Sequence, residues 1–262
     1  DLRMSRGLGD VYKRQLELSL NTVNFQTRAF KWTTNFNISF NKNKLTKLSL
    51  QKIYTAASSA EVVKENIVRN EPGRPLGVFY VYISDGVDPE TGNLIYRDLN
   101  EDGKISTSDR TYIGDPNPDW MASLGIDVSW RRFDFSIFFN GVFGNDVLNT
   151  KRFDQPSNMP MRWTADNPTN SYPRLNANRQ TKLSDWWVED GSFVRIQTMT
   201  LGYSIPFSKK DAARKIRLYV SADNLYTFTG FEGYDPEVGM TGIYSGGYPR
   251  LRKWTFGADF TF

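Results

Sequence analysis

The chain has 262 residues, which is enough for one large or two small domains, and it contains neither cysteine nor histidine. These absences exclude a disulfide framework, a Cys/His zinc site and catalysis through a Ser-His or Cys-His pair. The net charge of +4 is spread along the chain, which argues against a nucleic-acid partner. No apolar run reaches about 18 residues, so the sequence predicts no transmembrane helix, whereas membrane-spanning strands would escape such a test.

Residues 1–15 are polar and unpatterned, unlike the rest of the chain, and they contribute +2 of the net charge. They have no apolar core of the kind that a secretory signal peptide carries. We predict that 1–15 is a non-native or junction segment, and we assign the folded domain to 16–262.

Apolar and polar residues alternate along several later segments, which predicts β-strands with one apolar face. In 30–40, Trp32, Phe36, Ile38 and Phe40 alternate with Lys, Thr, Asn and Ser. In 120–130 and 133–143 the pattern restarts after only Arg131 and Arg132, which predicts a hairpin. The predicted strands are 16–22, 30–40, 45–54, 120–130, 133–143, 193–205, 216–228 and 250–262. Segments 16–22, 45–54 and 193–205 show the pattern more weakly, and in the last Arg195 and Gln197 break it.

A twelve-residue stretch between these strands, DLNEDGKISTSD, has the spacing of an EF-hand-type calcium loop. Its candidate ligands are Asp98, Asn100, Asp102, Lys104, Ser106 and Asp109. Pro116 and Pro118 come soon after it and prevent a full helix, so neither a calcium sensor nor a dockerin is expected. Two interpretations stay open: a static calcium site, or a polar turn in which Asp and Asn side chains bind the backbone. Calcium is the one cofactor that the sequence suggests.

The connections between the predicted strands alternate in length. Residues 41–44, 131–132 and 206–215 are short, 55–119, 144–192 and 229–249 are long, and 23–29 is intermediate. This sorting, together with Trp and Phe near the strand ends, is typical of outer-membrane β-barrels. The alternative is a soluble β-sandwich, whose apolar faces would meet each other.

Several motifs resemble the C-terminal barrel portion of SusC/RagA-type TonB-dependent outer-membrane transporters. They are WTTNFNISFNKNKLTKL, GRPLGVFYVY, YRDLNEDGKISTSDRTYIGDPNPDW, WWVEDGSFVRIQTMTLGYSIP and SADNLYTFTGFEGYDPE, in this order between 16 and 262. The resemblance implies an all-β antiparallel transmembrane barrel, of which this chain would supply about eight of roughly 22 strands with long extracellular loops. The plug domain would be absent, so the chain would be a fragment.

The resemblance also implies a function and partners. The whole protein would import oligosaccharides or peptides through the outer membrane of a Gram-negative bacterium of the Bacteroidota, with a SusD-like surface lipoprotein and energy from the TonB complex. Within the loops, Trp163, Trp186 and Trp187 are candidate ligand contacts, because Trp offers the largest flat apolar surface. Segment 224–239 is expected to form a fixed turn. Phe260 and Phe262 resemble the C-terminal signal that the outer-membrane assembly machinery recognises.

Two further alternatives remain open. The chain can be a soluble secreted β-protein that binds carbohydrate or a partner through its calcium loop, or a self-contained small outer-membrane barrel. An enzyme is not expected, because the acidic residues mostly occupy turn or lumen-facing positions rather than a catalytic pair of carboxylates.

Overall fold

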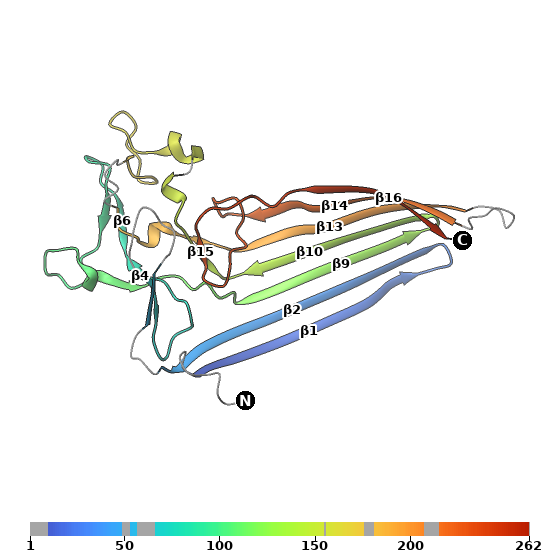
Figure 1. Ribbon diagram of the computed structural model, residues 1–262, viewed down its shortest axis with the longest axis horizontal. Coiled ribbons are helices and arrows are strands. Elements are labelled where there is room, and N and C mark those ends of the chain that lie inside the picture. The colour runs from blue at the N-terminus through green and yellow to red at the C-terminus, as the bar shows by residue number, and fades with distance from the viewer. Residues whose placement is uncertain are drawn as a thin grey trace.

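The computed structural model describes residues 10–48, 53–56, 66–154, 156–175, 181–206 and 215–261. Its main feature is one antiparallel seven-stranded sheet, which forms a curved wall with most loops at one end (Figure 1). The all-β antiparallel prediction is confirmed. In spatial order the strands are β1 (Asp10–Gln26), β2 (Phe30–Lys47), β9 (Trp120–Trp130), β10 (Phe133–Phe143), β13 (Phe193–Pro206), β14 (Lys215–Thr229) and β16 (Lys253–Thr261).

The predicted spanning strand at 45–54 is wrong: residues 45–47 end β2, 49–52 lie outside the described residues, and Ile53–Ala56 is a short loop strand. Within the described residues the wall therefore has seven strands. β2 does not turn at 41–44 but continues to Lys47, where it pairs with Asp10 of β1. Near this end of β2, the backbone of Leu45 also bonds a loop: its amide donates to the carbonyl of Arg74 (2.8 Å), and its carbonyl accepts from the amide of Gly73 (2.7 Å). Leu45 is fully buried there. Its apolar character therefore reflects a loop contact and not a membrane-facing strand.

The correction also changes which connections share an end of the wall. The link between β1 and β2 is only 27–29, and it lies at the same end as 131–132 and as the pair Pro206–Lys215 that ends β13 and begins β14. The long connections leave from the opposite end. β1 begins at Asp10, so residues 10–15, which we predicted to belong to a junction segment, take part in the pairing.

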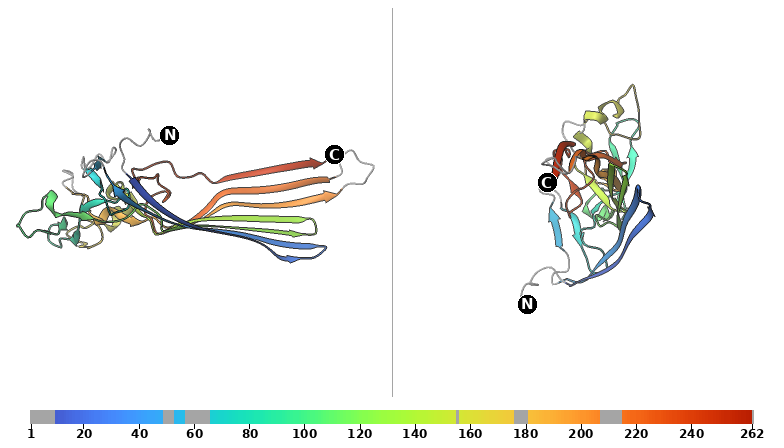
Figure 2. Two further views of the ribbon diagram at one scale, coloured as in Figure 1. Left: turned by 90° about the horizontal axis from the view of Figure 1, so that it is seen from below. Right: turned by 90° about the vertical axis from the view of Figure 1, so that its right-hand side faces the viewer.

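One face of the wall is apolar and exposed. Leu16 and Leu20 of β1 lie opposite Phe40 and Phe36 of β2, and the two leucines are 66% and 53% exposed. A soluble sandwich would bury this face beneath a second sheet. Within the described ranges no second sheet covers the wall, which is a single layer in Figure 2.

Aromatic side chains mark both ends of the apolar face. At the short-link end, the register lines up Phe30, Trp130, Phe133 and Tyr203 across four strands. At the loop end, Phe40 pairs with Trp120, whose ring stacks on Phe143 with centroids 3.7 Å apart. This is the arrangement of aromatic girdles.

The other face is polar and carries a bridge across several strands. Arg217 of β14 pairs with Asp134 of β10 (2.6 Å) and with Asp259 of β16 (3.1 Å). To reach Asp134 it crosses β13 at Gly202, where an added Cβ would lie 2.5 Å from the Asp134 carboxylate and 2.7 Å from Arg217 Nε. Glycine at this position is what lets the ion pair close.

The long connections fold into small sheets and short 3₁₀-helices. The strands are β3 (Ile53–Ala56) with β4 (Asn66–Asn70), β5 (Tyr80–Tyr82) with β8 (Arg110–Tyr112), β6 (Ser84–Val87) with β7 (Leu94–Tyr96), and β12 (Val188–Asp190) with β11 (Asp146–Asn149) and β15 (Ile243–Tyr244). The 3₁₀-helices are η1 (Thr107–Asp109), η2 (Arg152–Asp154), η3 (Pro156–Met161) and η4 (Asp185–Trp187). In the part of the chain that the structure describes, no helix has the length and apolar character needed to cross a membrane.

Among the described residues, the larger of two clusters of buried apolar side chains lies among these loops rather than in the wall. Its members are Ile67, Val68, Phe79, Val81, Leu148, Phe153, Leu183 and Trp187, drawn from two of the three long connections. The loops therefore form a packed layer of their own at one end of the wall.

Candidate functional site

The loop layer is held together by pairing between connections that are distant in sequence. β11 pairs with β12 and, in parallel, with β15, so that Leu148 donates to the carbonyl of Gly242 (2.9 Å). Tyr82 donates to the carbonyl of Leu183 (3.1 Å). All three long connections thus contribute to one surface, which is the candidate functional site.

The predicted calcium loop lies in this layer between strands, as the sequence indicated. β7 precedes it, η1 closes it and β8 comes directly after. The Asp98 carboxylate accepts from the amide of Gly103 (2.7 Å), which has φ of +79°. Asp102 accepts from the amide of Lys104 (2.8 Å), and the Asn100 amide group donates to Asp102 (3.0 Å). Through these hydrogen bonds the side chains of Asp98, Asn100 and Asp102 fix the backbone of the turn at 102–104.

Asp109 is the most enclosed member of the loop. Its carboxylate accepts from the amides of Ser106 (2.7 Å), Leu99 (2.9 Å) and Asn100 (3.4 Å), and the residue is fully buried. Hydrogen bonding by Ser106, reinforced by the other two amides, holds the pKa of Asp109 below its usual value. The side chain is therefore an ionised anchor.

One oxygen of this loop differs from the others. Asp98 Oδ1 is buried without a hydrogen-bond partner, while Oδ2 is engaged by Gly103. Within the described residues, no group of three or more Asp, Glu, His or Cys side chains is arranged to hold a metal ion. A calcium ion here would therefore depend on amide, hydroxyl and backbone oxygens beside the carboxylates, which are ligands that Ca²⁺ accepts.

The three candidate tryptophans have different surroundings. Trp187 is fully buried in the loop core and stacks on Phe153, so it offers no ring face to a ligand. Trp163 donates its indole N–H to the carbonyl of Pro89 (3.1 Å) and lies against Gly92. Trp186 is partly buried and donates to the carbonyl of Ser171 (2.9 Å).

Trp186 borders an open cavity of about 680 Å³. Its other lining residues are Arg152, Met161, Asn167, Pro168, Thr169, Ser171, Tyr172 and Glu232. Arg152 lies over the indole, with its guanidinium carbon 4.7 Å from the ring centroid, and pairs with Glu232 at 3.3 Å. Burial, followed by a hydrogen bond with Glu232, raises the pKa of Tyr172 to about 12, so this hydroxyl stays protonated.

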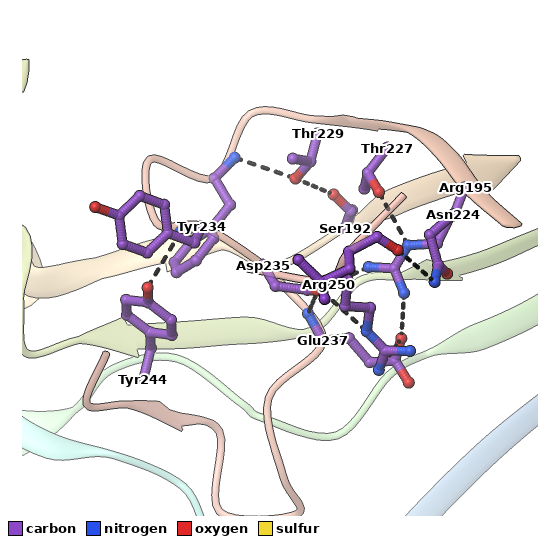
Figure 3. A network of polar contacts seen from close by, with 12 residues as sticks. Ser192, Arg195, Asn224, Thr227, Thr229, Tyr234, Asp235, Glu237, Tyr244 and Arg250 are labelled. Carbon is purple, nitrogen blue, oxygen red and sulfur yellow. Dashed lines mark hydrogen bonds and ion pairs between the residues drawn. The ribbon is translucent and has the colours of Figure 1, made fainter. Parts of the chain in front are cut away.

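A charge network that the sequence analysis missed fixes the connection between β14 and β16. Arg195 of β13 is almost completely buried and bonds Asp235 (2.7 Å), Glu237 (2.6 Å) and the Thr227 hydroxyl (2.9 Å). Arg250 binds the same two carboxylates, each at 2.9 Å (Figure 3). Four charges from a wall strand and both ends of one loop therefore form a closed cluster.

The interrupted alternation around Arg195 was the available signal for this cluster. A β-bulge between Ile196 and Thr198 shifts the register, so Arg195 lies opposite Asn140 and Thr227. The turn predicted over 224–239 is wrong for 224–229, which belong to β14, whereas 230–239 form a packed turn in which Phe231 meets Tyr244 at a ring distance of 5.2 Å. Phe260 lies on β16 opposite Ile216 and is 57% exposed, whereas Phe262 lies outside the described residues.

An open antiparallel wall with an exposed apolar face, aromatic residues at both of its edges and loops packed at one end has the features of an outer-membrane barrel wall. Comparison with known proteins points to the same class. The chain is 30% identical to TonB-dependent receptor P3 of Formosa agariphila over 98% of its length, and 26% identical to TonB-dependent receptor SusC of Bacteroides thetaiotaomicron over 99%. It is therefore homologous to TonB-dependent receptors. It spans 29% and 27% of those two relatives.

The solved structures support the same fold. The RagAB peptide transporter superposes with a TM-score of 0.81 at 23% identity, over 96% of this chain and 29% of the other. No protein-family profile matches the chain.

Proposed function

We propose that this chain forms part of an energy-coupled outer-membrane importer for oligosaccharides or peptides. The observation that carries the proposal is the homology to TonB-dependent receptors along nearly the whole chain, combined with an apolar face that no described segment covers. The relatives are receptors by name, and one structural relative is a peptide transporter. In this proposal the chain has no enzymatic activity and provides wall and loops.

The dimensions of the wall suit an outer membrane. β9 has eleven residues, and the ten rises between the first and the last span roughly 33 Å at about 3.3 Å per rise. With the tilt of about 40° that outer-membrane strands adopt, this corresponds to roughly 25 Å, the height of their apolar band. The aromatic girdles mark the two edges of that band.

The loop layer would then face outward and the short links the periplasm. This orientation leaves the loops available to substrate and to a SusD-like surface lipoprotein, while coupling to the TonB complex would depend on residues outside this chain. The C-terminal strand would engage the outer-membrane assembly machinery through Phe260 and Phe262. Deletion of Phe262 is expected to lower the amount of receptor in the outer membrane, and unchanged levels would contradict this part of the proposal.

The experiment is made on the receptor that carries this sequence, expressed in a Bacteroidota host. We expect the protein in the outer-membrane fraction, with gel migration that changes on heating, and uptake of an oligosaccharide or peptide that stops when TonB is deleted. Recovery in the culture supernatant without detergent would instead favour the soluble secreted β-protein. Uptake that persists without TonB would favour a passive small barrel.

We also propose that the loop 98–109 binds calcium as a static clip. The supporting observation is Asp98 Oδ1, which is buried without a partner beside a loop of calcium-binding spacing. Millimolar calcium is expected to slow hydrogen exchange of the amides of residues 98–109 in the wild type but not in Asp98→Asn. Glu90→Gln, a change in a neighbouring exposed turn, is the control. Equal exchange with and without calcium would leave the polar turn as the explanation.

A further inference from the structure

The cavity beside Trp186, hereafter the Trp186 pocket, is a built site rather than a gap between loops. Arg152 and the segment from Met161 to Tyr172 provide one side, Trp186 of η4 a second, and Glu232 of the connection after β14 a third. Arg152 ties the three segments together, because it hydrogen-bonds the carbonyl of Trp186 and pairs with Glu232 and Glu189. The volume of about 680 Å³ falls within the range of about 300–1,000 Å³ that small-molecule sites occupy.

We propose that the Trp186 pocket binds a neutral sugar unit of an oligosaccharide. This inference rests on the import function proposed above and names the substrate class and the residues that would meet it. The indole supplies the apolar surface. Its N–H is already used by Ser171 and the Arg152 guanidinium lies over the ring, so a ligand would meet the ring surface that Arg152 leaves uncovered. Sugar C–H groups carry slight positive charge and are attracted to the negative face of an aromatic ring.

The polar side chains around the ring suit hydroxyl groups. Arg152 donates only and Glu232 accepts only, and the two are held 3.3 Å apart, so together they can bond neighbouring sugar hydroxyls. Asn167, Thr169 and Ser171 add uncharged polar groups to the lining. One cation and one anion line the pocket, which balances its charge and favours a neutral sugar over an acidic one.

The backbone around the pocket argues against an extended peptide. Peptides that bind as an added strand need a row of free backbone groups. Here the carbonyls of Ser171, Tyr172 and Trp186 already accept from Trp186 Nε1, the Trp163 amide and Arg152. The pocket therefore presents side chains to its ligand.

The test uses the detergent-purified receptor that carries this sequence. Binding is measured by calorimetry against neutral glucose, mannose and xylose oligosaccharides, an acidic galacturonate oligosaccharide and a tryptic casein digest. Trp186→Leu keeps an apolar side chain but removes the aromatic face, and Glu232→Gln removes the charged acceptor. Tyr248→Leu, which changes a 94% exposed aromatic residue outside the pocket lining, is the matched control.

We expect a neutral oligosaccharide to bind the wild type, with about tenfold weaker binding in Trp186→Leu and Glu232→Gln and less than a twofold change in Tyr248→Leu. Because Trp186 packs on Trp187 (ring centroids 5.1 Å apart), Glu232→Gln at the rim serves as the second variant if Trp186→Leu does not fold. If the two variants weaken the binding of casein peptides and not the binding of sugars, the proposed substrate class is wrong. Sugar binding that neither variant weakens would overturn the pocket while leaving the import proposal intact, and a wild type that binds none of the probes would contradict both.

Discussion

Replacement of Arg195 by methionine should release the loop between β14 and β16 without unfolding the wall. Arg195 is 1% exposed and makes three side-chain hydrogen bonds, two of them to carboxylates. Removing one partner of a buried ion pair costs about 3–5 kcal/mol. Here Arg250 still neutralises Asp235 and Glu237, so we expect a smaller loss of about 2–3 kcal/mol in the local free energy of loop opening.

The matched control is Arg250→Met, because Arg250 binds the same two carboxylates from a position that is 42% exposed. Exposed ion pairs contribute about 0–1 kcal/mol. The two variants therefore remove the same charge from the same cluster and differ mainly in the burial of the arginine.

Hydrogen exchange of the Leu148 and Thr150 amides reports on this opening, because their acceptors are the carbonyls of Gly242 and Tyr244 in the same loop. We expect exchange about 30- to 150-fold faster in Arg195→Met and no more than about fivefold faster in Arg250→Met. Equal acceleration in the two variants would refute the argument that burial gives Arg195 its greater effect, and unchanged exchange in both would refute the anchoring of the loop by the cluster.

Three other predictions concern the core, the wall and pH. Phe79→Ala should destabilise the loop layer by about 3–5 kcal/mol, since Phe79 is fully buried, and loop hydrogen exchange would measure it. Gly202→Val should separate Arg217 from Asp134 and lower the melting temperature of the wall, whereas Gly247→Val, with no neighbour within 4 Å of its Cβ, should not. The pKa of Asp109 is depressed, so its stabilising contribution is present above its unfolded pKa of about 3.9 and is lost as pH falls through the folded value. Loop 98–109 should therefore lose amide protection below about pH 4, and Asp109→Asn should already lack it at pH 7.

The alternation of apolar and polar residues predicted the wall well, because the two faces of a strand can be recognised from the sequence of that strand alone. Segments 120–130 and 133–143 match β9 and β10 at every boundary. The failure at 45–54 has a physical reason: Leu45 is fully buried where its backbone bonds Gly73 and Arg74 of a distant loop, a contact that no local pattern records.

The loop layer could not be predicted for the same reason. The pairing of β11 with β15 and the packing of Phe79 with Trp187 join residues from different connections. From sequence alone Trp163, Trp186 and Trp187 are equivalent candidates, and only the fold distinguishes the buried Trp187 from the pocket-lining Trp186. Arg195 could be recognised in the sequence because it interrupts the alternation of its strand. No sequence pattern indicated its partners Asp235 and Glu237.

The charge cluster and the Trp186 pocket share one loop, which makes their coupling testable. Glu232 lies three residues before Asp235, and its own amide donates to Glu189 (2.8 Å), so its position depends on how the start of this loop is held. Arg195→Met, although remote from the pocket lining, should therefore weaken binding of the neutral oligosaccharide about as much as Glu232→Gln does, whereas Arg250→Met should not. Affinity that stays constant in Arg195→Met while hydrogen exchange in the loop accelerates would show that the contacts of Glu232 with Glu189, Arg152 and Tyr172 hold it without the cluster, and that the pocket is independent of the cluster.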